Sequence, residues 1–338
     1  MSGRARKVGI VDVAAAAGVS VATVSRAMRG YPNVAESTRE RVLEAARVLD
    51  YRPNPAAVRL AAGITNTVAV ATLDPAHWFV AEVIGGIDEV LTSAGYDLLL
   101  SGVTDQTQKT RFLEINAPNG HRCDAVILVD VALTNDEASL ALELGYTLVT
   151  VGFRLDNFSS VTIDNTDVAR LAVDHLIGLG HRRIGLVNMP GHELDFKAPQ
   201  LRRRGYFEAL ENAGIAVDPG IELTSGFTPA ETREPARRLL ERVDRPTAVF
   251  ATSDRQAFGV MLAARELGLR IPEDLSLVGV DDHEESELVG LTTVRQNVAE
   301  QGRSVAELLL EELRGEGMRH VDVPTELVVR SSTAPMSS

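Results

Sequence analysis

The side chains of residues 20–26 are the first in this chain whose types and spacing suggest a chemical role. Ser20, Thr23, Ser25 and Arg26 fall on the polar side of a predicted helix and supply hydroxyls and one guanidinium, but no carboxylate. Such groups donate hydrogen bonds to phosphate oxygens and to the edges of bases. This composition therefore favours a helix that lies against nucleic acid.

Two short helices joined by a turn are expected to position these side chains. Apolar residues recur at helical spacing over residues 10–17 and again over 21–28, and Gly18 interrupts the pattern. Ser20 is suited to cap the second helix, because its hydroxyl can accept a hydrogen bond from a free backbone amide. This is the pattern of a helix-turn-helix, whose second helix enters the major groove, although similar turns occur in other small helical bundles.

The sequence that follows narrows this choice. A third amphipathic helix is predicted over residues 37–49, with Ala35 where a capping hydroxyl would be favourable, so this helix is expected to fray or to start at Ser37. The whole stretch closely resembles the headpiece and hinge of the lactose/galactose repressor (LacI/GalR) family. The motifs that carry the resemblance are Val11-Asp12-Val13-Ala14, Gly18-Val19-Ser20, Thr23-Val24-Ser25-Arg26, Thr38-Arg39, Val42 and Tyr51-Arg52-Pro53-Asn54.

The resemblance implies a set of DNA contacts. Val21 and Ala22 would touch bases beside Arg26, which would make the main hydrogen-bonded contact, and Leu60 would insert into the minor groove at the operator centre. The hinge is too short to be a stable helix alone, so it is expected to fold when two copies meet on DNA. The DNA-binding residues predicted in this way are Ser20, Val21, Ala22, Thr23, Ser25, Arg26, Thr38, Tyr51, Asn54, Ala57 and Leu60.

The charge distribution agrees with a DNA-binding N-terminal region. The chain has 338 residues and a net charge of −13, but residues 1–62 hold ten Lys or Arg and five Asp or Glu. Their net charge is thus +5, which leaves −18 for the remainder. A basic N-terminal region joined to an acidic body is the asymmetry expected when only the first part binds DNA. A single cysteine, Cys123, excludes an internal disulfide and is expected to be packed and inert.

From residue 66 onward, short β-branched runs alternate with helical stretches. Strands are predicted at residues 67–73, 97–101, 125–129, 148–151, 184–188, 248–251 and 276–280. Helices are predicted at 83–94, 138–144, 168–179, 201–213, 229–243, 256–267 and 299–313. This alternation predicts parallel sheets with helices on both faces, and the length predicts two subdomains. The predicted fold is an all-α helix-turn-helix headpiece followed by an α/β core of two doubly wound parallel sheets.

Polar residues follow most of the predicted strands. Because ligands bind outside the carboxyl ends of parallel strands, these residues are expected to line a cleft. The residues that follow the strands are Asp74, Asp130, Phe153-Arg154, Met189-Pro190, Ser253-Asp254 and Asp281-Asp282, most of them polar. Carboxylates that accept hydrogen bonds, an arginine that donates them, and aromatic faces such as Phe79 suit a small polyhydroxylated ligand. Asp164 and Asp254 are equally consistent with simple helix caps.

The body also resembles the LacI/GalR core, which is similar to a periplasmic sugar-binding protein. The matching stretches are Asp74 with Phe79-Val80-Ala81-Glu82, Asp164-Asn165, His175-Leu176, Gly180-His181-Arg182-Arg183-Ile184, Arg202 with Gly205-Tyr206, Phe250-Ala251-Thr252-Ser253-Asp254, Gly279-Val280-Asp281-Asp282 and Leu291-Thr292-Thr293-Val294-Arg295-Gln296. The resemblance implies that Arg202 and Asp281 clamp an effector. The predicted effector-binding residues are Asp74, Phe79, Phe153, Arg154, Asp167, Arg202, Ser253 and Asp281. Trp78 stands where the family commonly has proline, and could shape the pocket or pack at its rim.

The resemblance also implies the domain boundaries. The headpiece would span residues 1–53, the hinge helix 54–63 and the core 64–338. Within the core, an N-subdomain would comprise about 64–162 and 294–322, and a C-subdomain about 163–293 and 323–338, with crossings near Thr162, Thr293 and Asp322.

These features predict a cytoplasmic transcriptional regulator, most simply a repressor. It would bind a pseudo-palindromic operator as a homodimer and respond to a sugar-like effector, with no cofactor and no metal. A tetramer built on a C-terminal coil is not expected, because no leucine-heptad stretch follows the core. Two alternatives stay open: control by a protein partner, or a sugar-binding protein without a regulatory response. The sequence shows no nucleophile elbow, phosphate-binding loop or catalytic-triad pattern, so none of these motifs favours an enzyme.

Overall fold

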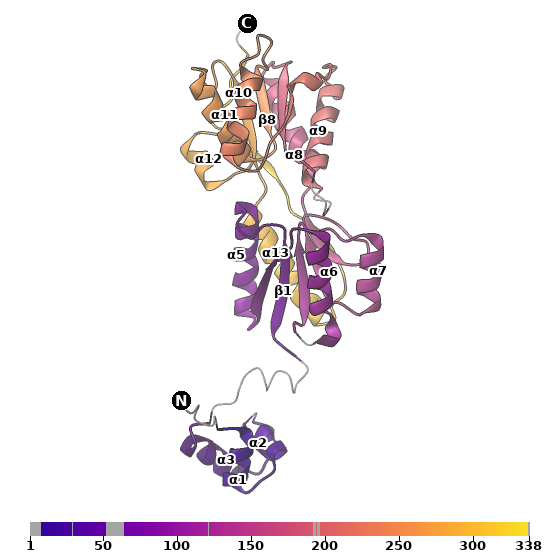
Figure 1. Ribbon diagram of the computed structural model, residues 1–338, viewed down its shortest axis with the longest axis vertical. Coiled ribbons are helices and arrows are strands. Elements are labelled where there is room, and N and C mark those ends of the chain that lie inside the picture. The colour runs from indigo at the N-terminus through magenta and orange to yellow at the C-terminus, as the bar shows by residue number, and fades with distance from the viewer. Residues whose placement is uncertain are drawn as a thin grey trace. The chain divides into compact units, whose positions relative to one another are not determined.

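The computed structural model describes residues 8–28, 30–51, 64–120, 122–191, 194 and 197–336. The chain forms two compact units, residues 1–65 and residues 66–338, which we call the N-terminal unit and the core unit (Figure 1). Each unit buries its own apolar residues, and each is described here by itself.

The N-terminal unit contains the helices α1 (Ile10–Ala17), α2 (Val21–Met28) and α3 (Glu36–Val48). Val13, Val24 and Val42, one from each helix, are fully buried against one another, which confirms the predicted three-helix arrangement. Helix α3 begins one residue before the predicted start, with Ala35 in the cap position and no side-chain cap. Among the described residues no single helix is long and apolar enough to span a membrane; only α1 and α2 counted together would be, and they are bent by 97°.

The first sheet of the core unit has the strand order β11-β5-β4-β3-β1-β2, with every neighbouring pair parallel. Its strands are β1 (Thr67–Thr72), β2 (Asp97–Gly102), β3 (Ala125–Val129), β4 (Leu148–Val151), β5 (Ser159–Thr162) and β11 (His320–Asp322). Alternate residues along β1 face opposite sides. Val68 and Val70 pack with helices α5 (Trp78–Ser93) and α13 (Val298–Leu313), whereas Ala69 and Ala71 pack with α6 (Gln106–Ile115) and α7 (Asn135–Glu143).

The second sheet has the order β12-β10-β9-β8-β6-β7, and only β12 is antiparallel to its neighbour. Its strands are β6 (Ile184–Asn188), β7 (Glu222–Thr224), β8 (Ala248–Ala251), β9 (Ser276–Asp281), β10 (Thr292–Arg295) and β12 (Glu326–Val328). Helices α8 (Asn165–Gly178) and α9 (Ala198–Asn212) cover one face, and α10 (Pro229–Leu240) and α11 (Asp254–Glu266) cover the other. The short helices are α12 (Glu284–Leu288), η1 (Pro118–Gly120) and η2 (Pro219–Ile221).

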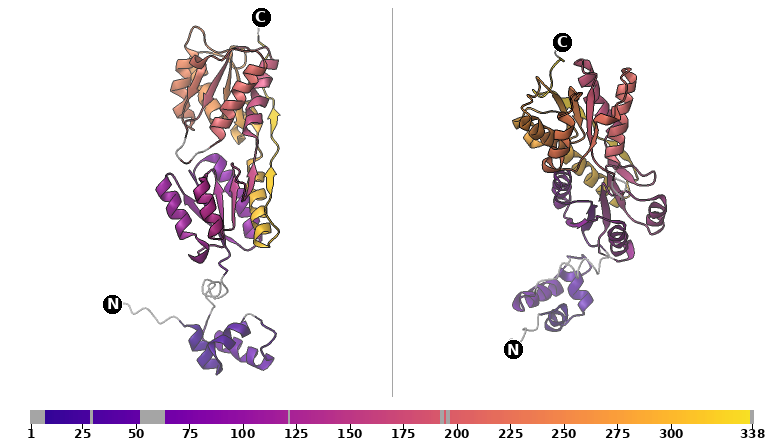
Figure 2. Two further views of the ribbon diagram at one scale, coloured as in Figure 1. Left: turned by 90° about the vertical axis from the view of Figure 1, so that its right-hand side faces the viewer. Right: turned by 45° about the horizontal axis from the view of Figure 1, so that its top comes forward.

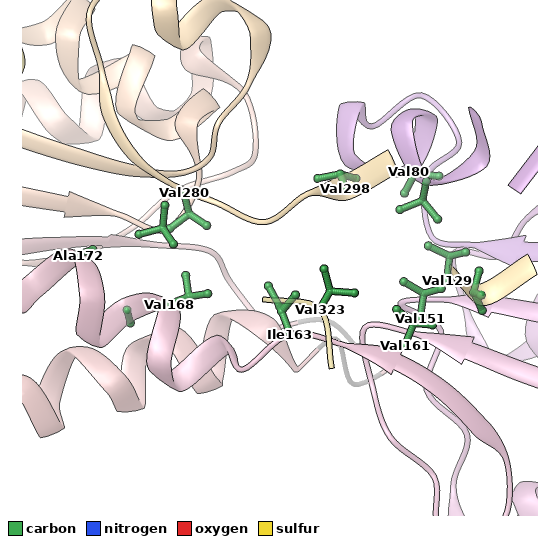
Figure 3. Packing of buried hydrophobic residues seen from close by; sticks show 14 of the residues in the cluster. Val80, Val129, Val151, Val161, Ile163, Val168, Ala172, Val280, Val298 and Val323 are labelled. Atoms are coloured by element: carbon green, nitrogen blue, oxygen red, sulfur yellow. The ribbon is translucent and has the colours of Figure 1, made fainter. Parts of the chain in front are cut away.

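The chain passes between the two sheets in three places: between β5 and α8, between β10 and α13, and between β11 and β12. Figure 2, left, shows β11 and β12 in yellow, one after the other along the edges of the two sheets. Ile163, Val298 and Val323, one from each crossing, belong to a single apolar cluster that also contains Val151 and Val280 (Figure 3). Strand β10 extends to Arg295, so the second crossing comes after the residue at which the sequence placed it.

Candidate functional site

The turn between α1 and α2 sets the position of the second helix. Gly18 ends α1 with a φ of 65°, a left-handed conformation that is easiest for glycine. Two residues later, the Ser20 Oγ accepts a hydrogen bond from the Thr23 backbone amide at 3.1 Å, so the predicted cap is present. The Ser20 and Thr23 hydroxyls are also hydrogen-bonded to each other at 2.9 Å, which fixes both at the start of α2.

The two sides of α2 have different environments. Val24 and Ala27 are buried in the three-helix core, whereas Ser20, Val21, Ala22 and Arg26 are exposed and Thr23 and Ser25 are half-buried. A helix that follows a tight turn and presents exposed or half-buried side chains, most of them polar, is the arrangement with which helix-turn-helix proteins read a major groove. The loop after α2 is held by Arg39, whose Nη2 donates to the Tyr31 carbonyl at 2.8 Å.

The other predicted DNA-binding residues lie beyond α2. Thr38 is half-buried in the first turn of α3. Tyr51 is also half-buried, and its ring packs against the three-helix core, so this side chain supports the unit as well as ending it. Asn54, Ala57 and Leu60, together with the whole predicted hinge, lie outside the described residues.

The core unit contains a cavity of about 660 Å³ between its two sheets. This volume is within the range of small-molecule sites. Strands β1, β3 and β4 of the first sheet and β8 and β9 of the second end at it, as expected for ligands that bind at the carboxyl edges of parallel strands. Its first-sheet wall includes Thr72, Asp74, Phe79, Asp130 and Gly152, and its second-sheet wall includes Asn165, Arg202, Ser253, Asp281 and Gln296.

Arg202 occupies a prepared position in the second-sheet wall. It lies on α9 and is only 5% exposed; its Nε donates to the Asn165 Oδ1 at 2.8 Å and its Nη1 to the Thr252 carbonyl at 2.6 Å. Gly205 allows α9 to approach α8 closely, because a Cβ there would lie 2.2 Å from the Thr166 carbonyl oxygen. Burial lowers the pKa of Arg202, nearby carboxylates oppose that shift, and a guanidinium keeps its charge in either case.

Asp281 and Asp254 form the acidic part of the same wall. Asp281 ends β9, lines the cavity and accepts a hydrogen bond from the Gln296 side-chain amide. Asp254 lies behind it and accepts from the His283 backbone amide at 2.9 Å and from the Ser286 and Thr293 hydroxyls, each at 2.6 Å. Burial raises the pKa of both carboxyls, and the charge of Asp254 raises that of Asp281 further.

In the first-sheet wall, fewer of the polar side chains are hydrogen-bonded to the protein itself. Asp130 follows β3 with a φ of 55°, and its Oδ1 occupies the space where a Cβ on residue 152 would be, which explains why that residue is Gly152. Burial raises the pKa of Asp130 to about 7, against the opposing charge of Arg202. Thr72 is fully buried at the end of β1, and its hydroxyl has no hydrogen-bond partner among the described residues.

The structure brings five of the eight predicted effector-binding residues to this cavity: Asp74, Phe79, Arg202, Ser253 and Asp281. Phe153, Arg154 and Asp167 do not line it, and in this respect the sequence-based placement was wrong. The turn at Gly152 directs Phe153 into the core beneath the sheet and leaves Arg154 exposed. Asp167 lies outside the cavity and forms an ion pair with Arg170, one turn further along α8.

Several cavity residues were not singled out from the sequence as binding residues. The most polar are Thr72, Asp130, Asn165, Gln296 and Arg255. Asp130 had been expected to line the cleft, because it directly follows a predicted strand, and it does line the cavity, although it was not included among the predicted effector-binding residues. Among the described residues, no group of three or more His, Cys, Asp or Glu side chains could hold a metal ion.

The structure also decides between alternatives that the sequence left open. Trp78 does not line the cavity; its ring packs on His283, with the ring centroids 4.6 Å apart, so it joins α5 to the loop before α12. Asp164 caps α8 by accepting from two backbone amides, whereas α11 is capped by Ser253 and not by Asp254. Cys123 is buried, which confirms the expected packed thiol, and burial raises its pKa to about 11, which disfavours the reactive thiolate.

Comparison with known proteins gives consistent matches to both units. Residues 9–54 match the family model for bacterial regulatory proteins of the lacI family, and residues 173–333 match a periplasmic binding protein-like domain. Catabolite control protein A of Priestia megaterium is 34% identical over 331 residues, which cover 96% of this chain and 98% of that protein.

Solved structures show the same similarity. A complex of the transcriptional regulator CelR with cellobiose is 32% identical, with a TM-score of 0.71, and the match covers 96% of this chain and 100% of that one. The lac repressor dimer bound to operator and the anti-inducer ONPF is 27% identical, with a TM-score of 0.84 over 97% of this chain and 100% of that one.

Proposed function

Because this chain is a transcriptional regulator of the LacI family, we propose that it represses its target genes as a homodimer on a pseudo-palindromic operator. We further propose that a small polar effector, a sugar or a related polyol, binds in the core cavity and controls operator affinity. The single observation that supports this control most strongly is the cavity itself, in which Arg202 and Asp281 are buried and held in place before a ligand binds.

The DNA-binding part of the proposal rests on α2. Its exposed side presents hydroxyls and Arg26, and two copies related by a two-fold axis would read two half-sites of opposite orientation. The lac repressor, a relative of this chain, binds its operator as a dimer. The protein would act in the cytoplasm, where the DNA is accessible.

The effector part rests on the chemistry of the cavity. The Asp281 carboxylate can accept hydrogen bonds from hydroxyls, the remaining N–H groups of Arg202 can donate to hydroxyl oxygens, and Phe79 offers an apolar ring face. The related regulator CelR has been solved with cellobiose. A ligand that touches both walls would favour one separation of the two sheets over others, and it can shift that equilibrium only by its difference in affinity for the two states.

The effector test measures operator binding by the full-length chain, titrated with a panel of sugars. Arg202→Ala and Asp281→Ala should each lose the response to any sugar that shifts the wild type, while basal operator binding is retained. Arg203→Ala is the matched control, because Arg203 is the next residue of α9 but forms an exposed ion pair with Glu222. A full response in both cavity variants would mean that the effector signal enters at another site, such as one bound by a protein partner. If no sugar changes the operator affinity of the wild type, control by a sugar is contradicted.

The DNA test compares two arginines of the N-terminal unit. Arg26→Ala should weaken operator binding by about 1–3 kcal/mol and relax specificity at one base position in each half-site. Arg47→Ala is the control, because Arg47 is an exposed α3 residue already paired with Glu44 at 2.7 Å. A loss that is uniform across operator variants would make Arg26 a phosphate contact and would contradict base readout.

A further inference from the structure

The first-sheet wall of the cavity contains a buried hydroxyl that nothing in the described protein satisfies. Thr72 lines the cavity and is 0% exposed, yet its Oγ1 has no hydrogen-bond partner in the described part of the chain. An unpaired buried hydroxyl is unfavourable, and native proteins rarely keep one without a ligand or a water molecule that completes it. The Thr72 hydroxyl therefore marks a point at which a hydrogen-bond partner from outside the described protein, a ligand atom or a water molecule, is expected.

A carboxylate lies at the end of the neighbouring strand. Strand β1 pairs with β3 in the register Thr72 to Val129, and Asp130 directly follows β3. Asp130 lines the cavity, and no hydrogen bond to its side chain is present among the described residues. Its position is defined by the backbone turn at φ 55° and by the space that Gly152 leaves. Thr72 and Asp130 together offer hydrogen-bond acceptors and one rotatable hydroxyl.

The buried charges around this wall do not balance. Among the described residues, the half-buried Asp130 and the buried Asp254 and Asp281 are acids at this end of the cavity, and the buried Arg202 is a base whose charge acts on all three. Both hydrogen bonds of Arg202 go to neutral oxygens, those of Asn165 and of the Thr252 carbonyl. Burial raises the pKa of Asp130, as expected for a carboxylate with too little compensating charge. An additional positive charge at this wall would restore the balance.

We propose that the effector carries a protonated amine, as an amino sugar does, and that this amine binds Asp130 and the Thr72 hydroxyl. An ammonium has three donors and no acceptor, which matches a wall that offers acceptors. A neutral hydroxyl could also bind Asp130, but it would leave the negative charge of this half-buried carboxylate uncompensated. Anionic ligands, such as sugar phosphates and sugar acids, would be repelled by the same carboxylates.

The other charged groups of the cavity do not provide this compensation. Asp74 adds a further negative charge, and one of its oxygens accepts from the Ala76 backbone amide at 2.9 Å. Arg255 also lines the cavity near His77; burial lowers the pKa of that histidine, and the charge of Arg255 lowers it further. The amine is therefore assigned to the wall formed by β1 and β3 and not to the part lined by Arg255 and His77.

This inference rests on the proposed function, because it specifies the ligand of the same cavity. The test uses D-glucose, D-galactose and D-mannose, each in three forms: the parent sugar, its 2-amino derivative and the N-acetyl form of that derivative. Binding to the full-length protein is measured by calorimetry at pH 7. At least one amino sugar should bind about tenfold or more tightly than both its parent and its N-acetyl form, because hydrogen bonds to charged groups are the stronger ones.

Three variants locate the amine. Asp130→Asn keeps the shape and tolerates the positive φ, and it should reduce the preference for the amine to about threefold or less. Thr72→Val should weaken amine binding without lowering the melting temperature, because it replaces an unsatisfied hydroxyl with a methyl group. Asp156→Asn, at an exposed position of the β4–β5 connection, is the control and should behave as the wild type does.

The outcomes separate this inference from the function on which it rests. Tighter binding of a neutral parent sugar than of its amine would overturn the amine inference and leave control by a sugar standing. A preference for the amine that survives in both Asp130→Asn and Thr72→Val would overturn the assignment to this wall. Binding of no member of the panel would overturn the amino-sugar effector and contradict the sugar-like effector at the same time.

Discussion

The two walls of the cavity differ in how completely their polar groups are bonded. On the second-sheet side, Arg202 makes two hydrogen bonds and Asp254 receives three, all from the protein itself. On the first-sheet side, the Thr72 hydroxyl has no partner among the described residues, and burial raises the pKa of Asp130 to about 7. One wall is thus organised before a ligand arrives, whereas the other is completed by the ligand.

This difference matters because a cavity between two sheets must do two things. A rigid wall lowers the entropic cost of binding, since its side chains are already fixed in the orientation that the ligand needs. A wall whose polar groups lack partners gains hydrogen bonds only when the ligand reaches it. These bonds therefore stabilise the state in which both sheets contact the same molecule. The unequal bonding therefore links ligand binding to the separation of the sheets.

The largest expected effect is on stability, from a substitution in the organised wall. Asp254→Ala removes the acceptor of three buried donors and should lower the free energy of unfolding by about 3–5 kcal/mol. Thr72→Val in the other wall should leave the free energy of unfolding unchanged or raise it slightly, because no hydrogen bond is lost. Chemical denaturation of both variants measures the contrast. Equal losses in the two variants would show that the walls do not differ in this way.

A smaller effect is expected at the residue that orients Arg202. Asn165→Ala removes the acceptor of the Arg202 Nε and should cost about 2 kcal/mol of stability, since this hydrogen bond involves a charged group. It should also weaken the response to the effector, because the guanidinium would keep only its bond to the Thr252 carbonyl. Operator titration with the effector measures the response, with Asn212→Ala at the exposed end of α9 as the control. An unchanged response would mean that Asn165 does not position Arg202.

The sequence predicted the fold better where apolar residues alternate regularly than where polar residues are buried. Strand β5 was missed because it contains Ser159 and Ser160, yet both are fully buried. Their hydroxyls are hydrogen-bonded to Arg319 and His320, which follow about 160 residues later in the sequence. Helix α6 was missed because its surface is polar, although its Lys109 is buried against Glu137 at 2.8 Å. In each case the compensating partner is distant in sequence.

The same limitation applies to the cavity. Arg202 and Asp281 could be placed by resemblance, because their motifs are distinctive. Thr72 looks like any β-branched strand residue, and only the structure shows that its hydroxyl has no partner among the residues described. Phe153 was misplaced because the direction of its side chain depends on the left-handed turn at Gly152, where φ is 89°. The elements could therefore be predicted from the chain, whereas the bonding state of each wall could not.

The smallest expected effect is a pH dependence that belongs to the unsatisfied wall. The pKa of Asp130 is raised from 3.8 to about 7 in the folded protein, so its contribution to stability is fully present below about pH 4 and is lost as the pH rises through 7. Asp130→Asn removes this titration. Without ligand, the variant should match the wild type near pH 4 and exceed it by about 1–2 kcal/mol near pH 8, because Asp130 is partly exposed and the full shift is not realised.

Denaturation at a series of pH values, with Asp156→Asn as the control, tests this difference. An amino sugar should reduce this difference, since an ammonium beside the carboxylate stabilises the charged form in the wild type but has no carboxylate to stabilise in Asp130→Asn. The advantage of the variant at pH 8 should then shrink or disappear when the amino sugar is added. If Asp130→Asn is more stable than the wild type by the same amount at pH 4 and at pH 8, the difference comes from packing. The charge of Asp130 would then not be the cause of the charge imbalance in this wall.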